Sequence, residues 1–157
     1  MLPRFEIIEH PADVGFIAHG ATLEELFVNA ALALASLACA PGEIVEREQR
    51  EIVARAADIE SLLYAWLAEI LAIADAEHLV FRRFIVTHLA SAAAKTETEP
   101  REGLRDELRE EVRGIAFGEP FDRARHAAGT YLKAVTYHQF RIEQTPAGFR
   151  ATVFLDL

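Results

Sequence analysis

Two stretches of this sequence repeat apolar residues at the spacing of an amphipathic helix, and strand-like segments lie before, between and after them. The first helix is predicted to begin after Thr22, which forms a capping box with Glu25, and to end at Pro41 and Gly42. The second is predicted to begin after Asp58, a favourable N-cap residue. Because each helix has one apolar face, both must pack against another layer. Together with antiparallel strands they predict an α+β fold, a two-layer α/β sandwich with a mostly antiparallel sheet.

The strand predictions rest on short runs of β-branched and aromatic residues. They cover residues 5–10, 14–19, 44–56 and 79–89, followed by a C-terminal hairpin of residues 132–142 and 149–157 around the turn sequence TPAG. Residues 104–118 are ambiguous, and their apolar spacing alone favours a helix. Residues 91–103 are small and polar, which predicts a flexible loop within one domain that spans residues 1–157.

The charge of the chain excludes some classes of partner. Its 157 residues carry a formal net charge of −9, and residues 1–60 hold 11 acidic against 4 basic side chains. Without clustered Lys and Arg, direct binding to nucleic acid or to an anionic membrane is not expected. Charged or polar residues interrupt every apolar stretch before the roughly 20 residues that a spanning helix needs. The N-terminus lacks the apolar run of a signal peptide and the chain has one cysteine, so we expect a cytoplasmic protein.

Common catalytic motifs are missing from the sequence. It contains no phosphate-binding loop, no dinucleotide-binding glycine motif, no HExxH zinc motif and no nucleophile elbow. Cys39 follows an alanine-rich helix and is expected to be a buried small hydrophobe, not a nucleophile. Polar clusters around residues 10–13, 133–138 and 156 are what remains to carry chemistry.

Asp13 and Asp156 are the candidate metal ligands among these clusters. Each also has a structural interpretation, since Asp13 could cap a turn and Asp156 could lie in a frayed strand end. Two carboxylates that lie close together need a cation between them or a shared proton. Hard cations such as Ca²⁺ and Mg²⁺ prefer oxygen ligands, and Leu157 would add a carbonyl or a terminal carboxylate.

Lys133 is the other unusual residue, because it is one of only two lysines and lies inside a run of β-branched residues. Either its amine reaches solvent from an antiparallel sheet, or it binds a carboxylate. His10 and His138 belong to the same clusters and are further candidate functional residues.

These clusters and the motifs around them resemble the archease family, small proteins that assist the tRNA-splicing ligase. The resemblance covers nearly the whole chain, and its most specific motifs are HPADVG at residues 10–15 and KAVTYH at residues 133–138. The helix motifs GATLEELF at 20–27 and DIESLLYAWL at 58–67 are weaker, because any amphipathic helix could supply them. The resemblance also includes GEP at 118–120, His126 and VFLDL at 153–157. The family usually has Thr where Pro11 stands, and the Ala- and Glu-rich segment 91–103 is unusual for it.

The resemblance implies an archease-type fold in which residues 104–118 form a strand that ends near Gly118. It implies a non-catalytic accessory protein that promotes guanylylation and multiple turnover of the tRNA-splicing RNA ligase, which uses GTP and a divalent metal. It also implies that Asp13, Asp156 and the carbonyl of Leu157 bind a divalent cation, commonly Ca²⁺, with Mg²⁺ or Mn²⁺ as alternatives. Lys133 would contact a phosphate or Asp13. Whether an RNA helicase or an RNA methyltransferase is also a partner stays open.

Two other functions compete with this one. The first is a stand-alone metal-dependent enzyme on a phosphorylated substrate, with Asp13 and Asp156 as ligands, Lys133 for phosphate and His138 as acid or base. The missing nucleophile and phosphate loop weigh against it. The second is a structural or chaperone-like adaptor in RNA processing, in which the polar residues have only structural roles.

Overall fold

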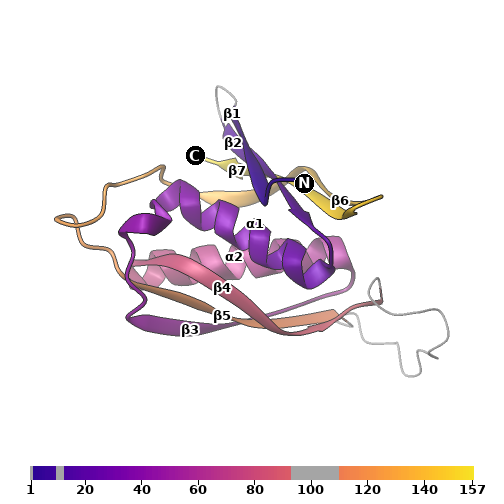
Figure 1. Ribbon diagram of the computed structural model, residues 1–157, viewed down its shortest axis with the longest axis horizontal. Helices are drawn as coiled ribbons and strands as arrows, with labels where there is room; N and C mark the ends of the chain where they lie inside the picture. Colours follow the sequence, from indigo (N-terminus) through magenta and orange to yellow (C-terminus); the bar gives the residue numbers. More distant parts are fainter. Residues whose placement is uncertain (1, 10–12, 93–109) are drawn as a thin grey trace.

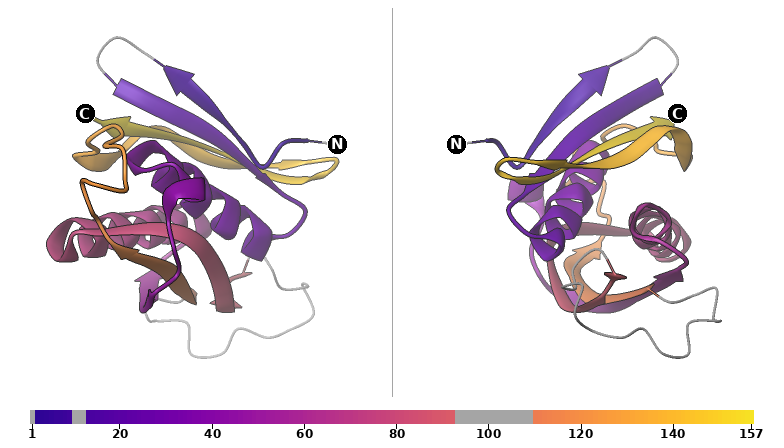
Figure 2. Two further views of the ribbon diagram at one scale, coloured as in Figure 1. Left: turned by 60° about the vertical axis from the view of Figure 1, so that its left-hand side comes forward. Right: turned by 90° about the vertical axis from the view of Figure 1, so that its right-hand side faces the viewer.

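The structure is a computed structural model that describes residues 2–9, 13–92 and 110–157. Along the chain it contains β1 (Phe5–Glu9), β2 (Asp13–Gly20), α1 (Leu23–Ala38), the 3₁₀ helix η1 (Pro41–Glu43), β3 (Glu48–Ala56), α2 (Ile59–Glu77), β4 (Leu79–Ala90), β5 (Glu110–Pro120), β6 (Ala134–Thr145) and β7 (Gly148–Asp156). The strands form two antiparallel sheets, one with the order β1-β2-β7-β6 and one with the order β3-β5-β4. Both helices lie between these sheets (Figures 1 and 2).

The predicted α+β class, with antiparallel strands and two main helices, is confirmed. The structure goes beyond the prediction in one respect, because the strands divide between two sheets and the helical layer is covered on both faces (Figure 1). α1 contacts β2 of one sheet and β4 of the other, and α2 contacts β6 and β3 in the same way. A helix enclosed from two sides buries more than one stripe, and Ala30, Ala31 and Ala33 of α1 are all fully buried.

The predicted helix starts are confirmed at both N-caps. The backbone N–H of Glu25 donates to Thr22 Oγ1 at 3.1 Å, and the N–H of Ser61 donates to Asp58 Oδ1 at 2.8 Å. α1 ends at Ala38, just before the 3₁₀ turn that contains Pro41. Local capping chemistry therefore determines where each helix begins.

Trp66 joins three elements in the centre of the core. Its side chain is fully buried, and its indole N–H donates to the carbonyl of Phe27 in α1 at 3.1 Å. The same ring lies over Gly114 of β5, where an added Cβ would be 2.6 Å from it. Trp66 thus fixes α2 against both α1 and the three-stranded sheet.

The helix favoured by the apolar spacing of residues 104–118 is wrong for the described part of this segment. Residues from Glu110 onward form β5, the central strand of its sheet, and the strand implied by the family resemblance is confirmed there. Buried and half-buried residues alternate from Glu110 to Gly118, as expected for a strand with neighbours on both edges. Residues 104–109 lie outside the described residues.

Two strands begin two or more residues later than predicted. β3 begins at Glu48 instead of residue 44, because Ile44 is buried and the N–H of Val45 donates to a side chain, Glu119 Oε2, at 2.6 Å. β6 begins at Ala134, two residues later than predicted. The C-terminal hairpin itself, formed by β6 and β7, is confirmed.

The predicted flexible loop 91–103 is described only at its first two residues. Ser91 Oγ donates to Glu110 Oε2 at 2.8 Å, and the N–H of Ala92 donates to Glu110 Oε1 at 3.1 Å. Residues 93–103 lie outside the described residues, so their flexibility stays a prediction. Neither α1 nor α2, the long helices of the described part, has the length and apolarity to cross a membrane.

Candidate functional site

Asp13 and Asp156 lie directly opposite each other on the neighbouring strands β2 and β7. Asp13 is the first residue of β2 and Asp156 is the last residue of β7, so the pair closes the ladder between these strands. Opposite residues in an antiparallel pair have Cβ atoms about 4.5–5.5 Å apart and side chains on the same face. The structure therefore brings the two predicted carboxylates together, with Asp13 half-buried and Asp156 exposed.

The two aspartates point away from the helical layer. Their strand neighbours Val14 and Leu155 are buried in the core, and side chains alternate between the faces of a sheet. On the aspartates' own face the ring of Phe154 covers Gly15, where an added Cβ would lie 2.7 Å from Phe154 Cδ1. Phe154 is thus the aromatic side chain next to the carboxylate pair.

His138 lies beside Phe154 on this outer face. The two rings have centroids 5.8 Å apart, and the His138 side chain is exposed. The backbone N–H of His138 donates to Thr136 Oγ1 at 3.3 Å. The histidine therefore belongs to the same surface as the aspartates.

Lys133 immediately precedes β6, so the prediction that it lies inside a strand is wrong by one residue. Its backbone N–H donates to the carbonyl of Asp156 at 2.9 Å, and the next residue, Ala134, lies opposite Asp156 in the β6–β7 ladder. The Lys133 side chain is exposed, and within the described ranges its ammonium group forms no ion pair with either aspartate. The lysine is thus held to the carboxylate edge by its backbone, and its side chain is exposed.

The donors gathered at this edge are oxygens, the type that fits a hard cation. Leu157 directly follows Asp156 and is 50% exposed. His10 lies outside the described residues, together with Pro11 and Ala12. Among the residues that the structure does describe, no group of three or more His, Cys, Asp and Glu side chains lies close enough to hold a metal. Carbonyl and water oxygens commonly complete a Ca²⁺ or Mg²⁺ site, so two carboxylates with Leu157 form a fitting but partial set.

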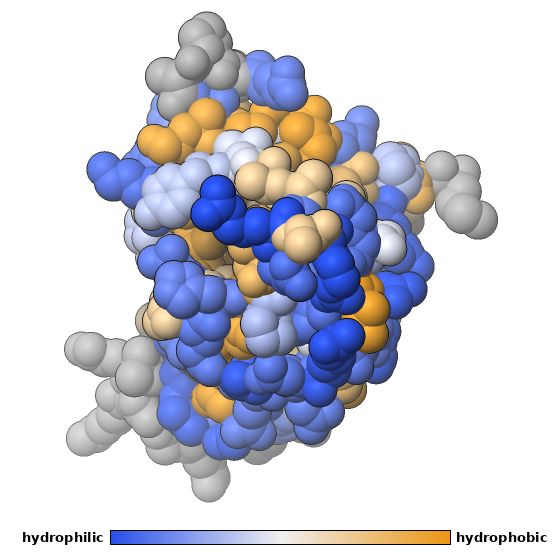
Figure 3. All heavy atoms as spheres, turned by 90° about the vertical axis from the view of Figure 1, so that its left-hand side faces the viewer, coloured by the Kyte–Doolittle hydropathy of each residue, from blue (hydrophilic) through white to orange (hydrophobic). Residues whose placement is uncertain are grey.

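The surface near the C-terminus is uneven in hydropathy. Hydrophilic residues cover most of the face that Figure 3 shows, and hydrophobic residues gather toward its upper end. Tyr131 and Tyr137 are among the large apolar side chains that the described residues expose, with 68% and 61% of their surface accessible. Exposed tyrosines are common at contact surfaces because the ring is apolar and the hydroxyl polar.

α2 covers the outer edge of β6, the last strand of the four-stranded sheet. Tyr64 Oη donates to the carbonyl of Val135 at 3.1 Å, and the N–H of Ile142 donates to Glu60 Oε2 at 2.8 Å. Tyr64 also stacks on Tyr137 with ring centroids 3.9 Å apart. These contacts satisfy edge groups of β6 that would otherwise be open to pairing with another strand.

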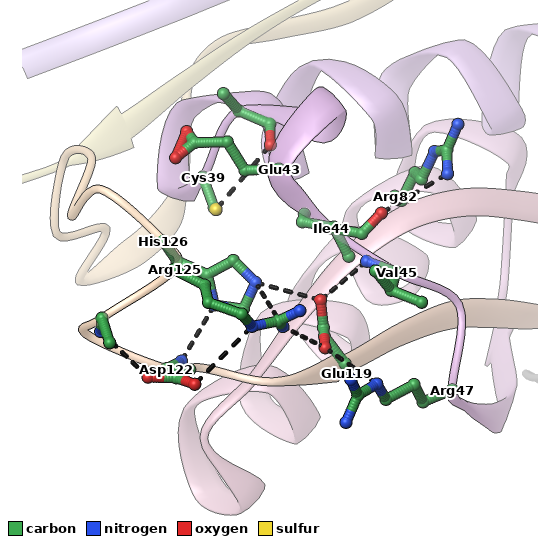
Figure 4. Close-up of polar contacts among 12 residues, drawn as sticks. Cys39, Glu43, Ile44, Val45, Arg47, Arg82, Glu119, Asp122, Arg125 and His126 are labelled. Carbon is green, nitrogen blue, oxygen red and sulfur yellow. Dashed lines mark hydrogen bonds and ion pairs between the residues drawn. The ribbon is translucent and has the colours of Figure 1, made fainter.

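Glu119 is the centre of a buried polar cluster that sequence reasoning did not predict (Figure 4). Glu119 lies near the end of β5, and its side chain is only 2% exposed. Glu119 Oε2 accepts from the N–H of Val45 at 2.6 Å and lies 3.0 Å from His126 Nε2, while Arg125 donates to Oε1. The hydrogen bond from Val45, followed by those from His126 and Arg125, lowers the pKa of Glu119 to about 2.

His126 has a defined tautomer in this cluster. The backbone N–H of Asp122 donates to His126 Nδ1 at 2.8 Å, so Nδ1 carries no proton. The proton is then on Nε2, which donates to the Glu119 carboxylate. The family resemblance included the GEP motif and His126, but no spacing in the sequence indicates that they meet.

The Glu119 cluster fixes the irregular segment between β5 and β6. At one end Glu119 holds Arg125 and His126, and at the other the N–H groups of Gly129 and Thr130 donate to the last carbonyls of α1 at 3.1 and 2.9 Å. This segment leads directly to Lys133. Its hydrogen bonds explain how a stretch without regular secondary structure delivers Lys133 to the carboxylate edge.

Comparison with known protein families and with curated sequences identifies the same family in each case. The model of the Archease protein family (MTH1598/TM1083) matches residues 5–157. Protein archease of Methanosarcina acetivorans is 35% identical, over 98% of this chain and 96% of its own length. Protein archease of Pyrococcus abyssi is 37% identical, over 94% and 93% of the two chains.

Two solved structures have the same fold. Protein 1598 of Methanobacterium thermoautotrophicum, solved in solution, has a TM-score of 0.78 at 32% identity, covering 98% of this chain and 99% of its own. A crystal structure of an archease from Thermotoga maritima, described as a possible chaperone, has a TM-score of 0.57 at 18% identity and covers 96% and 94%.

Proposed function

Because the chain belongs to the Archease protein family, we propose that it is an accessory protein of tRNA splicing that activates the tRNA-splicing RNA ligase. In this proposal it promotes the GTP-dependent guanylylation and the multiple turnover of the ligase and catalyses no reaction itself. The observation that carries the proposal is the cross-strand pairing of Asp13 with Asp156. The net charge of −9 supports action through the ligase instead of through direct contact with RNA.

We propose that Asp13, Asp156 and Leu157 hold a divalent cation, Ca²⁺ in the first place and Mg²⁺ or Mn²⁺ as alternatives. Like charges directly opposite in a sheet are unfavourable, and a cation between the carboxylates would offset the repulsion. A bound cation would supply positive charge at an otherwise acidic edge. Lys133 is attached by its backbone to Asp156 and would place its amine beside that charge, where a phosphate can bind.

The test is a guanylylation and ligation assay with the purified ligase of the same organism, GTP and a series of divalent metals. Wild-type protein is expected to stimulate the ligase, and chelation is expected to abolish the effect. Asp13→Asn and Asp156→Asn should each lose the stimulation without unfolding. Glu69→Gln is the matched control, because it removes one negative charge from an exposed position on α2. Normal stimulation by both aspartate variants would refute the role of the acidic edge.

The same assay distinguishes the competing functions. A chaperone-like role, described as possible for the Thermotoga maritima relative, predicts an effect that survives chelation and both aspartate substitutions. A stand-alone enzyme predicts nucleotide turnover by this chain in the absence of the ligase. Stimulation that needs the cation and the ligase together would support the proposed activator.

A further inference from the structure

A cavity of about 510 Å³ lies between α1, β4 and the residues that precede β1. Its charged lining consists of three arginines and two glutamates: Arg4, Arg82, Arg83, Glu25 and Glu46. This is an excess of positive charge in a chain whose net charge is −9. The volume lies within the range of about 300–1,000 Å³ that is typical of small-molecule sites.

The cavity is distinct from the carboxylate edge. Arg4 is placed by its carbonyl, which accepts from the N–H of His19 near the end of β2 at 2.9 Å. Asp13 is at the opposite end of the same strand. At about 3.3 Å per residue, these ends are roughly 20 Å apart.

A β-bulge brings two consecutive arginines to this cavity. Phe81 pairs with Gly118 and Arg83 with Phe117, so Arg82 is an extra residue in β4. Consecutive strand residues normally point to opposite faces, and a bulge redirects a side chain. Arg82 and Arg83 therefore both line the cavity, an arrangement that a regular strand would not allow.

Arg83 forms a fixed wall of the cavity. Its guanidinium donates to both carboxylate oxygens of Glu46 at 2.9–3.1 Å. Its Cζ also lies 3.9 Å from the ring centroid of Phe117. Arg83 and Glu46 thus neutralise each other and hold one side of the cavity in place.

The side chains of Arg82 and Arg4 form fewer polar contacts than that of Arg83. Arg82 donates to the carbonyl of Ile44 at 3.4 Å. Figure 4 shows that Arg82 and Glu119 lie on opposite sides of residues 44–45. In the described part of the chain neither Arg82 nor Arg4 forms an ion pair, and Glu25 is the only acid at the cavity besides Glu46. A guanidinium carries five N–H donors, so both side chains retain donors for a ligand.

We propose that this cavity binds a small phosphorylated molecule of mononucleotide size, with its phosphate held by Arg4 and Arg82. The planar guanidinium fork matches phosphate oxygens and can bind them through paired hydrogen bonds. Val28, Leu32 and Phe84 line the same cavity and would contact the apolar part of the ligand. The function is separate from activation of the ligase at the acidic edge.

Calorimetric titration of the full chain with pyrophosphate, GTP, guanosine and a short single-stranded RNA tests the proposal. Pyrophosphate or GTP should bind and guanosine should not. Arg82→Gln should weaken binding about tenfold or more, because a charge-assisted hydrogen bond to phosphate is lost. Glu25→Gln should strengthen it by removing a negative charge. Arg123→Gln, which removes an exposed arginine at a different cavity, is the control and should leave affinity unchanged.

The outcomes separate the possible sources of phosphate. If both probes bind and the binding depends on the arginines, the phosphate groups are what the cavity recognises. If only GTP binds, the ligand is a nucleotide. If only pyrophosphate binds, the ligand is a free polyphosphate. If Arg82→Gln does not fold, Arg4→Gln replaces it, because the backbone hydrogen bond of Arg4 is kept. No binding of either probe at millimolar concentration, binding unaffected by the arginine substitutions, or binding of RNA alone would overturn the proposal.

Discussion

Replacing Asp156 with Asn should make the protein more stable than wild type without divalent cations and less stable than wild type with them. The first half of the prediction follows from the register, which places the carboxylates of Asp13 and Asp156 directly opposite each other. At about 5 Å in a water-like dielectric, their repulsion is about 0.8 kcal/mol, and screening by physiological salt reduces it to about 0.4 kcal/mol. In a chelator the variant should therefore melt about 1–3 °C higher, with the larger shift at low salt.

The second half of the prediction comes from linkage to the cation. A ligand at about 100 times its Kd stabilises the folded state by about 2.7 kcal/mol. Asp156→Asn removes one of the two carboxylates and with it most of this gain. For a chain of this size, wild type in saturating Ca²⁺ should then melt about 4–8 °C above the variant.

The assay is thermal unfolding followed by circular dichroism, in EDTA and across a Ca²⁺ series. Glu69→Gln is the control, because it changes the net charge equally and lies on α2, away from the strand ends. It should leave the Ca²⁺ response of wild type unchanged. An equal increase in Tm for wild type and Asp156→Asn would refute the reasoning, as would a wild-type protein that shows no increase with Ca²⁺, Mg²⁺ or Mn²⁺.

Three further predictions concern the contact of Gly15 with Phe154 and the two buried groups Glu119 and Cys39. Gly15→Ala should destabilise the protein by about 1–3 kcal/mol in urea unfolding, because the added Cβ would lie 2.7 Å from the ring of Phe154. Gly42→Ala is the control and should not destabilise it in this way, because no described atom lies within 4 Å of that Cβ position. Hydrogen bonds lower the pKa of Glu119 to about 2, below its ordinary 4.5, so its stabilising contribution is present above that ordinary value and is lost as the pH falls toward 2. Glu119→Gln should flatten the pH dependence of urea unfolding in that window, and an unchanged slope would contradict this. Burial, with Glu43 and Glu119, raises the pKa of the Cys39 thiol, so thiol reagents should label it slowly in the native state and rapidly in urea.

The sequence predicts those parts of the fold that depend on neighbouring residues. Thr22 and Asp58 cap their helices as expected, because an N-cap needs only a side chain and an N–H three residues later. Cys39 is buried, as its alanine-rich surroundings predict. The final hairpin is correct for the same local reason.

The prediction failed where structure depends on distant partners. Apolar residues at 104, 108, 112 and 115 fit a helix, yet the chain from Glu110 is a strand with β3 and β4 on its two sides. The division of the strands between two sheets likewise depends on pairing that periodicity does not encode. The Glu119 cluster was missed because Val45, which supplies its shortest backbone hydrogen bond, lies 74 residues away in the sequence.

Asp156 is paired on both sides, which argues against the interpretation that it lies in a frayed strand end. β7 lies between β2 and β6, and Asp156 is opposite Asp13 on one side and Ala134 on the other. Its carbonyl also accepts from the N–H of Lys133. To separate the two carboxylates by fraying, the chain would have to give up hydrogen bonds to both neighbouring strands. The folded state therefore keeps the two carboxylates close together and retains their repulsion. A cation bound between them would then stabilise the folded state most, because it removes this repulsion.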